Sequence, residues 1–308
     1  MADTPTRPTW LVTGATGFLG ANIGAFLDGR AHRIGSARTK IAGDALYDEY
    51  LTGDLEHPET LVAAIEARRP DVVIHAAALA SHEACEADPA RAEQINAHAA
   101  GVLSDAAARC GARFVLISTD AVFDGERGNY TETDELHPTT VYGRTKLMGE
   151  HLVSENPDAL IVRTNFFGWS PSGSRSILEF FVNELSAGRP VRGFTDFTTT
   201  SAYAPVLADV IWRLMQGDAT GTFHVTSPDA LTKHDFGIAV AQAFGLPTDL
   251  ITPSTADVHP PCGRDLSLDV TKVQTWLGEA LPSQLDGIAR ALADSATLRP
   301  ALANTLGN

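Results

Sequence analysis

A phenol and an amine lie four residues apart in the segment Tyr142-Gly143-Arg144-Thr145-Lys146. Residues at this spacing share one face of a helix. The unperturbed pKa of a phenol is about 10, so a tyrosine alone is a poor proton donor near neutrality. A lysine cation one turn away favours the phenolate and lowers that pKa toward the working range of a general acid. The pair therefore predicts proton donation by Tyr142, with Lys146 tuning its pKa.

A glycine-rich turn, Gly14-Ala15-Thr16-Gly17-Phe18-Leu19-Gly20, follows an apolar run and opens a helical pattern. In dinucleotide sites the first glycine permits a tight turn, the second lets a pyrophosphate approach the backbone, and the third brings helix and strand together. The helix N-terminus then favours the phosphates. The spacing is G-x-x-G-x-x-G rather than G-x-G-x-x-G. The turn predicts a dinucleotide site, and a tight turn without a ligand is the alternative.

The end of the second strand indicates which dinucleotide binds. NAD sites place a carboxylate there, whereas NADP sites place an arginine. Here Ser36, Arg38 and Lys40 follow, and no acid appears before Asp44. This pattern favours NADPH over NADH, unless the two basic residues are only solvated loop charges. Further on, Gly53-Asp54-Leu55 follows a strand-like stretch, where Asp54 could accept a hydrogen bond from the adenine amino group.

Strand-like and helical patterns alternate along the first half of the chain. This order predicts a parallel sheet covered on both faces, an α/β fold of the doubly wound Rossmann type. We expect residues 9–165 to form the NADP-binding domain, with about 195–222 returning to it. Residues 166–194 and 223–300 would form a smaller substrate-binding lobe, and 1–8 and 301–308 flexible termini. Expected strands are 10–13, 33–36, 71–75, 114–118, 160–163 and 221–226; expected helices are 22–27, 60–68, 90–110, 140–154, 177–187, 203–215, 235–244 and 271–277.

The composition narrows the classes of partner. The chain has 308 residues and a net charge of -15, which argues against nucleic acid or an anionic membrane surface. No apolar run approaches the roughly 20 residues that a membrane span needs. Its three cysteines are scattered, as is typical of the reducing cytoplasm rather than of a disulfide scaffold. We expect no metal site, because His75, His82 and Cys85 do not complete a set of four ligands.

Together these motifs resemble the extended short-chain dehydrogenase/reductase family, which pairs a TGxxGxxG loop with a Tyr-x-x-x-Lys helix and an upstream Ser or Thr. Within it, the chain is most similar to the dTDP-4-dehydrorhamnose reductase branch. The resemblance extends over about residues 11–277 and is strongest before Asn165. The residues that carry it are Val12-Thr13-Gly14, Gly53-Asp54-Leu55, His75-Ala76-Ala77-Ala78, Asn96, Ile117-Ser118-Thr119-Asp120-Ala121-Val122-Phe123-Asp124-Gly125, Tyr130-Thr131-Glu132, Pro138, the segment from Val141 to Glu150, and Ile161-Val162-Arg163-Thr164.

The resemblance implies hydride transfer from a nicotinamide to a ketone, C4 of a nucleotide-linked deoxysugar. Tyr142 would donate the proton, Thr119 would hold the carbonyl oxygen, and Lys146 would also bind the nicotinamide ribose. The implied cofactor is NADPH, with NADH as an alternative, and the implied assembly is a homodimer. Expected cofactor contacts are Gly14, Thr16, Gly17, Phe18, Leu19, Arg38, Asp54, Leu55, His75, Ala76, Ala77, Asn96, Ser118, Tyr142, Lys146 and Asn165; expected substrate contacts are Thr119, Asp120, Asn165, Arg175, Arg192 and Arg264.

Several readings of the resemblance stay open. Sugar dehydratases carry Asp-Glu after the threonine, whereas here Asp120 is followed by Ala121, which disfavours water elimination. A 4-epimerase uses the same three catalytic residues. The regulatory subunit of methionine adenosyltransferase is also similar to this branch, so a cofactor-binding protein without turnover is a further alternative. The stretch 196–201 and Arg264-Asp265 depart from the branch pattern, which puts the specific sugar in doubt.

Overall fold

The computed structural model describes residues 7–38, 46–256 and 263–304. The first half of the chain contains β1 (Thr9–Thr13), α1 (Phe18–Phe26), β2 (His32–Ala37), β3 (Glu49–Thr52), α2 (Glu59–Arg68), β4 (Val72–His75), α3 (His82–Ala87), α4 (Pro89–Glu93), α5 (Ala99–Cys110), β5 (Arg113–Thr119), α6 (Val141–Val153) and β6 (Leu160–Thr164). The second half contains β7 (Phe166–Phe167), α7 (Ile177–Ser186), β8 (Val191–Phe194), β9 (Thr198–Thr200), β10 (Ala202–Tyr203), α8 (Ala204–Gln216), β11 (Gly221–His224), β12 (Ala230–Thr232), α9 (Lys233–Phe244), β13 (Ile251–Ser254), α10 (Thr271–Leu277), α11 (Gln284–Ala293) and α12 (Leu298–Ala303).

Seven strands form one parallel sheet in the order β11-β6-β5-β4-β1-β2-β3. Strand β1 pairs with β2 on one side and with β4 on the other, so the strand order reverses at β1. Ligands of open α/β sheets bind at such a switch point, beyond the carboxyl ends of the strands. The sheet confirms the predicted Rossmann-type α/β fold.

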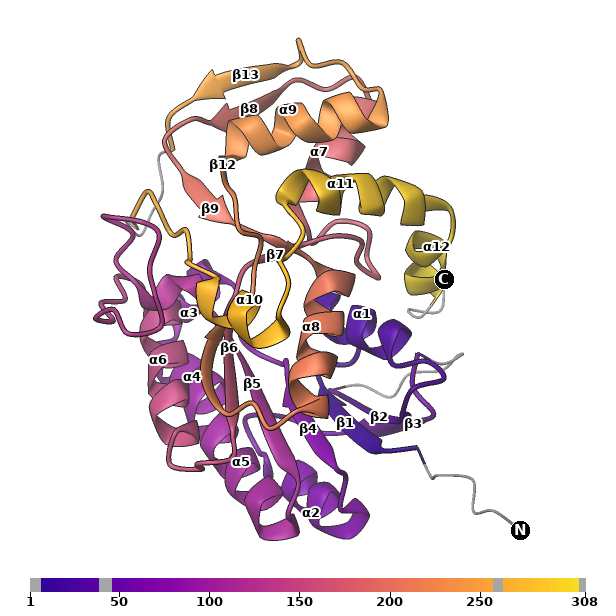
Figure 1. Cartoon of the computed structure of the whole chain (residues 1–308), viewed down its shortest axis with the longest axis vertical. Helices are drawn as coiled ribbons and strands as arrows, with labels where there is room; N and C mark the ends of the chain where they lie inside the picture. Colours follow the sequence, from indigo (N-terminus) through magenta and orange to yellow (C-terminus); the bar gives the residue numbers. More distant parts are fainter. Residues whose placement is uncertain (1–6, 39–45, 257–262, 305–308) are drawn as a thin grey trace.

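Side chains of successive strand residues pack on opposite faces of the sheet, as the period of two requires. Trp10 and Val12 belong to the core that also contains residues of α1 and α8. Leu11, between them, belongs to the core that contains residues of α2 and α5. Helices therefore cover both faces (Figure 1).

A smaller lobe lies at one end of the sheet (Figure 1) and contains β7, β8, β9, β10, β12, β13, α7, α9, α11 and α12. Its strands pair in twos: β8 with β13, β9 with β12, and β7 with β10. Phe181 of α7, Val240 of α9 and Ile288 of α11 share its core. After β10 the chain returns to the sheet, where α8 packs against α1 and β11 pairs with β6.

Two expected segments differ in detail from the structure. The expected helix 90–110 is one continuous helical run, in which a π-helical turn, Gln94–His98, joins α4 to α5. The expected flexible C-terminus 301–308 is helical as far as Ala303, because α12 buries Leu302 completely. Residues 305–308, like 1–6, lie outside the described part of the chain.

Candidate active site

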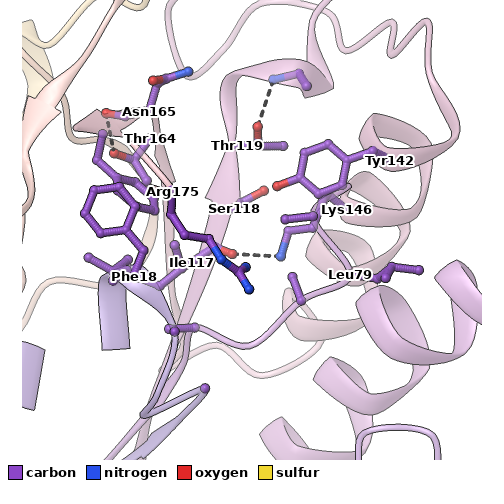
Figure 2. Close-up of a pocket in the computed structure, with 18 of the residues that line it drawn as sticks. Phe18, Leu79, Ile117, Ser118, Thr119, Tyr142, Lys146, Thr164, Asn165 and Arg175 are labelled. Carbon is purple, nitrogen blue, oxygen red and sulfur yellow. Dashed lines mark hydrogen bonds between the residues drawn. The ribbon is translucent and has the colours of Figure 1, made fainter. Parts of the chain in front are cut away.

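A cavity of about 910 Å³ lies at the carboxyl ends of the sheet strands. One wall consists of residues that end or follow these strands, and the lobe supplies the other. Figure 2 shows Tyr142, Lys146, Ser118 and Thr119 on one side of this cavity and Phe18 and Arg175 on the other. Members of the two walls include Gly14, Arg38, Ala76, Asp120, Asn165, Phe197, Lys233 and Gln284.

The glycine turn brings backbone N–H groups to the cavity. Gly14 has φ +72°, and a Cβ there would meet the Ala77 Cα at 2.9 Å. At Gly20 a Cβ would meet the Gly14 carbonyl oxygen at 2.1 Å, so α1 approaches the turn closely. Gly17 caps α1 without any side-chain hydrogen bond, which leaves the helix N-terminus open toward the cavity. This open terminus fits a dinucleotide pyrophosphate, and Thr16, Phe18 and Leu19 line the cavity beside it.

The predicted adenosine contacts lie at the far end of the same cavity. Ser36, Arg38, Asp54 and Leu55 all line it. Arg38 is exposed directly after β2, and the Asp54 carboxylate accepts the Glu56 N–H at 3.0 Å. Lys40 and Asp44 lie outside the described residues.

His75 is not in the cavity wall, although we expected it to touch the cofactor. Its side chain is buried at the end of β4, where Nδ1 lies 2.9 Å from the Thr13 hydroxyl. That hydroxyl oxygen accepts the Ala77 N–H at 3.2 Å, and Ala76 and Ala77 do line the cavity. His75 therefore positions this backbone from behind. Burial lowers the pKa of His75 to about 3, so the imidazole is neutral.

Asn96 also supports the wall from behind rather than lining it. Its side chain is buried, donates to the Leu79 carbonyl at 3.1 Å and accepts the Leu79 N–H at 2.8 Å. It also donates to the Thr145 hydroxyl at 3.1 Å. The expected direct contact with the cofactor is thus replaced by a link between the cavity wall and α6.

Tyr142, Lys146 and Thr119 converge on the cavity. Helix α6 begins after Thr140, whose side chain accepts the Gly143 N–H at 3.1 Å. Tyr142 and Lys146 follow on one face of that helix, and Thr119 ends β5. Figure 2 shows the Tyr142 oxygen turned toward Ser118 and Thr119.

The Tyr142 phenol has a raised pKa, contrary to our expectation. Burial is the largest cause, the charge of Asp120 adds to it, and a hydrogen bond with Thr119 acts in the opposite direction. Lys146 is not among the groups that shift this pKa. Tyr142 is therefore a neutral phenol at neutral pH.

Lys146 is held by the strand behind it. Its Nζ donates to the Ile117 carbonyl at 2.7 Å (Figure 2), and the side chain is 2% exposed. Burial lowers its pKa to about 8, while the charge of Glu150 opposes this shift. One N–H of the Lys146 ammonium thus donates to the backbone, and its other two N–H groups can donate to a ligand.

A buried ion pair lies one turn below Lys146 on α6. Glu150 accepts from Arg163 of β6 at 2.7 Å, and both side chains are 4% exposed. The same carboxylate accepts the Ser118 hydroxyl proton at 2.5 Å. Ser118 lines the cavity, so the pair fixes its orientation beside Tyr142.

Asp120 forms a second buried cluster in the wall. Its carboxylate accepts from the Asn165 amide at 2.9 Å, from Thr199 at 3.2 Å and from the Thr119 hydroxyl at 3.0 Å. Burial raises the pKa of Asp120. Asn165 also accepts the Ser201 hydroxyl proton at 3.1 Å, which joins the sheet to the lobe.

Of the three arginines expected to bind substrate, only Arg175 lines the cavity. Figure 2 shows its side chain extending into the space opposite Lys146. Arg192 is exposed on β8, away from the cavity wall. Arg264 is also outside the wall and pairs with Asp196 at 3.4 Å. The structure therefore corrects the expectation for both.

No group of three or more His, Cys, Asp or Glu residues among the described residues is arranged to hold a metal ion. Within the same described ranges, no helix has the length and apolarity needed to cross a membrane.

The family model described as the RmlD substrate binding domain matches residues 9–297 of this chain. The chain belongs to this family. The match covers the sheet, the cavity and the lobe, and the short-chain dehydrogenase/reductase resemblance is confirmed in its dTDP-4-dehydrorhamnose reductase-like branch.

Proteins similar to this RmlD-family chain include both reductases and a subunit of methionine adenosyltransferase. The probable low-salt glycan biosynthesis reductase Agl14 of Haloferax volcanii is 36% identical over 291 residues, which cover 90% of this chain and 95% of the relative. Methionine adenosyltransferase 2 subunit beta of Rattus norvegicus is 30% identical over 305 residues, covering 92% and 86%. A crystal structure of a hypothetical dTDP-4-dehydrorhamnose reductase from Sulfolobus tokodaii superimposes with a TM-score of 0.79 at 29% identity, covering 91% of this chain and 98% of that one.

The RmlD-family cavity also contains side chains that sequence reasoning did not assign to the site. Helix α3 contributes His82, and the lobe contributes Phe197, Lys233 and Gln284. The departure from the branch pattern at residues 196–201 was a signal for Phe197 only, because this stretch, which includes β9, lines the cavity. Lys233 and Gln284 lie outside it.

Proposed function

We propose that this protein is an NADPH-dependent reductase of a nucleotide-linked 4-keto-6-deoxysugar, similar to dTDP-4-dehydrorhamnose reductase. The observation that carries the proposal is the meeting of Tyr142, Thr119 and Lys146 at a cavity that also contains the open N-terminus of α1. The relatives named as reductases support the same chemistry. Arg38, at the end of β2, favours NADPH, and NADH remains the alternative cofactor.

The proposed reaction adds a hydride and a proton across a ketone. When bound, NADPH would supply the hydride that the ketone carbon receives. As negative charge develops on the ketone oxygen, Tyr142 donates its phenolic proton to that oxygen. Its raised pKa keeps the proton in place until the oxygen becomes the stronger base. The products would be the alcohol, NADP⁺ and a Tyr142 phenolate, which regains a proton from water.

Thr119 and Lys146 hold the reacting groups. The Thr119 hydroxyl, turned from Asp120 toward the substrate, donates to the same ketone oxygen. Lys146 binds the nicotinamide ribose with the N–H groups that Ile117 does not use. Arg175 extends into the cavity and pairs with the substrate diphosphate.

Two further expectations belong to the proposal: the scattered cysteines favour a cytoplasmic location, and the resemblance implies a homodimer. Met148 and Leu152 of α6 are 39% and 40% exposed and lie over a hollow on the outer surface. An apolar patch of this kind supports association between copies.

A second candidate function is a dinucleotide-binding regulatory subunit, which the similarity to methionine adenosyltransferase 2 subunit beta favours. NADPH oxidation against a panel of dTDP- and UDP-4-keto-6-deoxysugars separates the candidates. We expect oxidation of one equivalent of NADPH for each alcohol formed. Tight NADPH binding without oxidation by any member would support the regulatory subunit, and exchange of 4-epimers without net oxidation would support an epimerase.

A further inference from the structure

His82 lies beside the proposed proton donor, yet the reaction above does not use it. It is the first residue of α3, after Ser81, whose side chain caps the helix by accepting the Ala84 N–H at 3.2 Å. The His82 and Tyr142 rings are in contact, with centroids 5.0 Å apart and planes tilted by 48°. The imidazole also lines the cavity. Any substrate whose ketone reaches the Tyr142 hydroxyl therefore lies within reach of His82.

Charged side chains of three different segments act on the His82 imidazole. Asp120 at the end of β5 and Glu86 of α3 raise the pKa of His82, whereas Lys233 of α9 lowers it. Partial desolvation at the cavity wall is the largest cause and lowers the pKa overall, and the side chain remains exposed to solvent. The imidazole is thus neutral near pH 7, with one nitrogen that donates and one that accepts.

Among the described residues, neither ring nitrogen of His82 forms a hydrogen bond. Two polar side chains near it in the chain bond elsewhere: Ser81 accepts from Ala84, and Glu86 accepts from Val141. A donor and an acceptor beside the reacting centre need a polar partner when a substrate displaces water from the cavity. A hydroxyl group satisfies a neutral imidazole well, because it too both donates and accepts.

The chemistry of a 4-keto-6-deoxysugar identifies that hydroxyl. C4 has two neighbours in the ring: C3 bears a hydroxyl, and C5 bears the methyl group and the ring oxygen. With the ketone oxygen at Tyr142, the 3-hydroxyl is the hydroxyl adjacent to the reacting carbon. We propose that His82 binds the 3-hydroxyl of the keto sugar and makes the enzyme prefer 3-hydroxy over 3-deoxy substrates. This inference rests on the proposed function.

The test compares kcat/KM for a nucleotide-linked 4-keto-6-deoxysugar and for its 3-deoxy analogue. His82→Phe keeps an aromatic ring against Tyr142 but removes both nitrogens. We expect the wild-type preference for the 3-hydroxy substrate to fall by about 10- to 100-fold in His82→Phe, the change that corresponds to one substrate hydroxyl left without its hydrogen bond. His82→Gln, which can still donate and accept, is expected to recover part of the preference.

Equal loss of kcat/KM on both substrates would overturn the inference, because it would reduce His82 to a packing partner of Tyr142. An unchanged preference would overturn it as well. NADPH titration and thermal melting of each variant show whether it is folded, and His82→Leu, which also lacks both ring nitrogens, replaces His82→Phe if the latter does not fold. If the wild-type protein reduces neither sugar, the proposed function fails before the role of His82 is tested.

Discussion

The Tyr142 phenol keeps its proton across the neutral range, because burial raises its pKa. The helical spacing of Tyr142 and Lys146 predicted that the two residues would work together, but it could not indicate how deeply each is buried. Burial acts on both groups and moves their pKa values apart, up for the phenol and down to about 8 for the amine. The pair thus contains an acid that holds its proton until an alkoxide forms.

Arg38 provides a prediction about the cofactor. Arg38→Ala should weaken NADPH binding by about tenfold or more, because a hydrogen bond to a charged group contributes about 1.5–3 kcal/mol. NADH binding should change little, since NADH lacks the 2′-phosphate. Fluorescence titration measures both affinities, and Arg30→Ala, at the surface against Phe26, is the control. An equal loss for both cofactors would contradict the assignment of NADPH.

Helix α6 brings three functional groups to one side at intervals of four residues: Tyr142, Lys146 and Glu150. Glu150 appeared in the sequence only as part of a family motif. Its partner Arg163 belongs to β6, and its other partner Ser118 belongs to β5. Ser118 and Arg163 are neighbours in the sheet register, and α6 places Glu150 against both. The distances between these residues along the sequence could not predict this cluster.

Replacing Glu150 tests the electrostatic coupling along α6. Glu150→Gln should shift the alkaline limb of the kcat profile to lower pH, because the carboxylate raises the pKa of Lys146 against the effect of burial. It should also lower the unfolding free energy by about 3 kcal/mol, since Arg163 is left buried without its partner. The pH profile separates the two effects. Glu155→Gln, beyond the end of α6, is the control, and an unshifted alkaline limb would contradict the coupling.

Elements of the sheet and of the lobe differed in how well the sequence predicted them. Long apolar runs and helical periodicity indicated the buried strands and the large helices, and those predictions agree with the structure within a few residues. The lobe strands β8, β9, β12 and β13 have three or four residues each and pair with distant segments. Their order depends on tertiary partners, so no local pattern indicates them. Nothing in the sequence indicated that His82 belongs to the site. Helix α3 has only six residues, too few for a periodic pattern that would show which side chains face the cavity.

On the scale of the whole molecule, two buried histidines link stability to pH. Burial lowers the pKa of both His75 and His224 to about 3. In the unfolded chain each takes up a proton below its ordinary pKa of 6.5, whereas the folded protein does not until far lower pH. The contribution of the two histidines to stability is therefore fully present above about pH 6.5, and it is lost as the pH falls from there toward their folded-state pKa of about 3.

We expect the unfolding free energy to fall by about 2 kcal/mol between pH 6.5 and 5.5, roughly 1 kcal/mol from each histidine. Urea denaturation at a series of pH values measures this slope. His224→Gln should remove about half of it, whereas His137→Gln, at the surface, is the control. A stability that is constant down to pH 5.5 would contradict the burial of neutral histidines.

The role of Tyr142 as proton donor is tested most directly by the turnover of the Tyr142→Phe variant. Loss of NADPH absorbance measures this turnover with the best 4-keto sugar from the panel. The variant lacks only the hydroxyl that donates the proton, so its turnover should fall by about 10²–10⁴-fold. Its NADPH affinity should remain close to that of the wild type, because the glycine turn and Lys146 are unchanged. Wild-type turnover in Tyr142→Phe would contradict the assignment of Tyr142 as the proton donor.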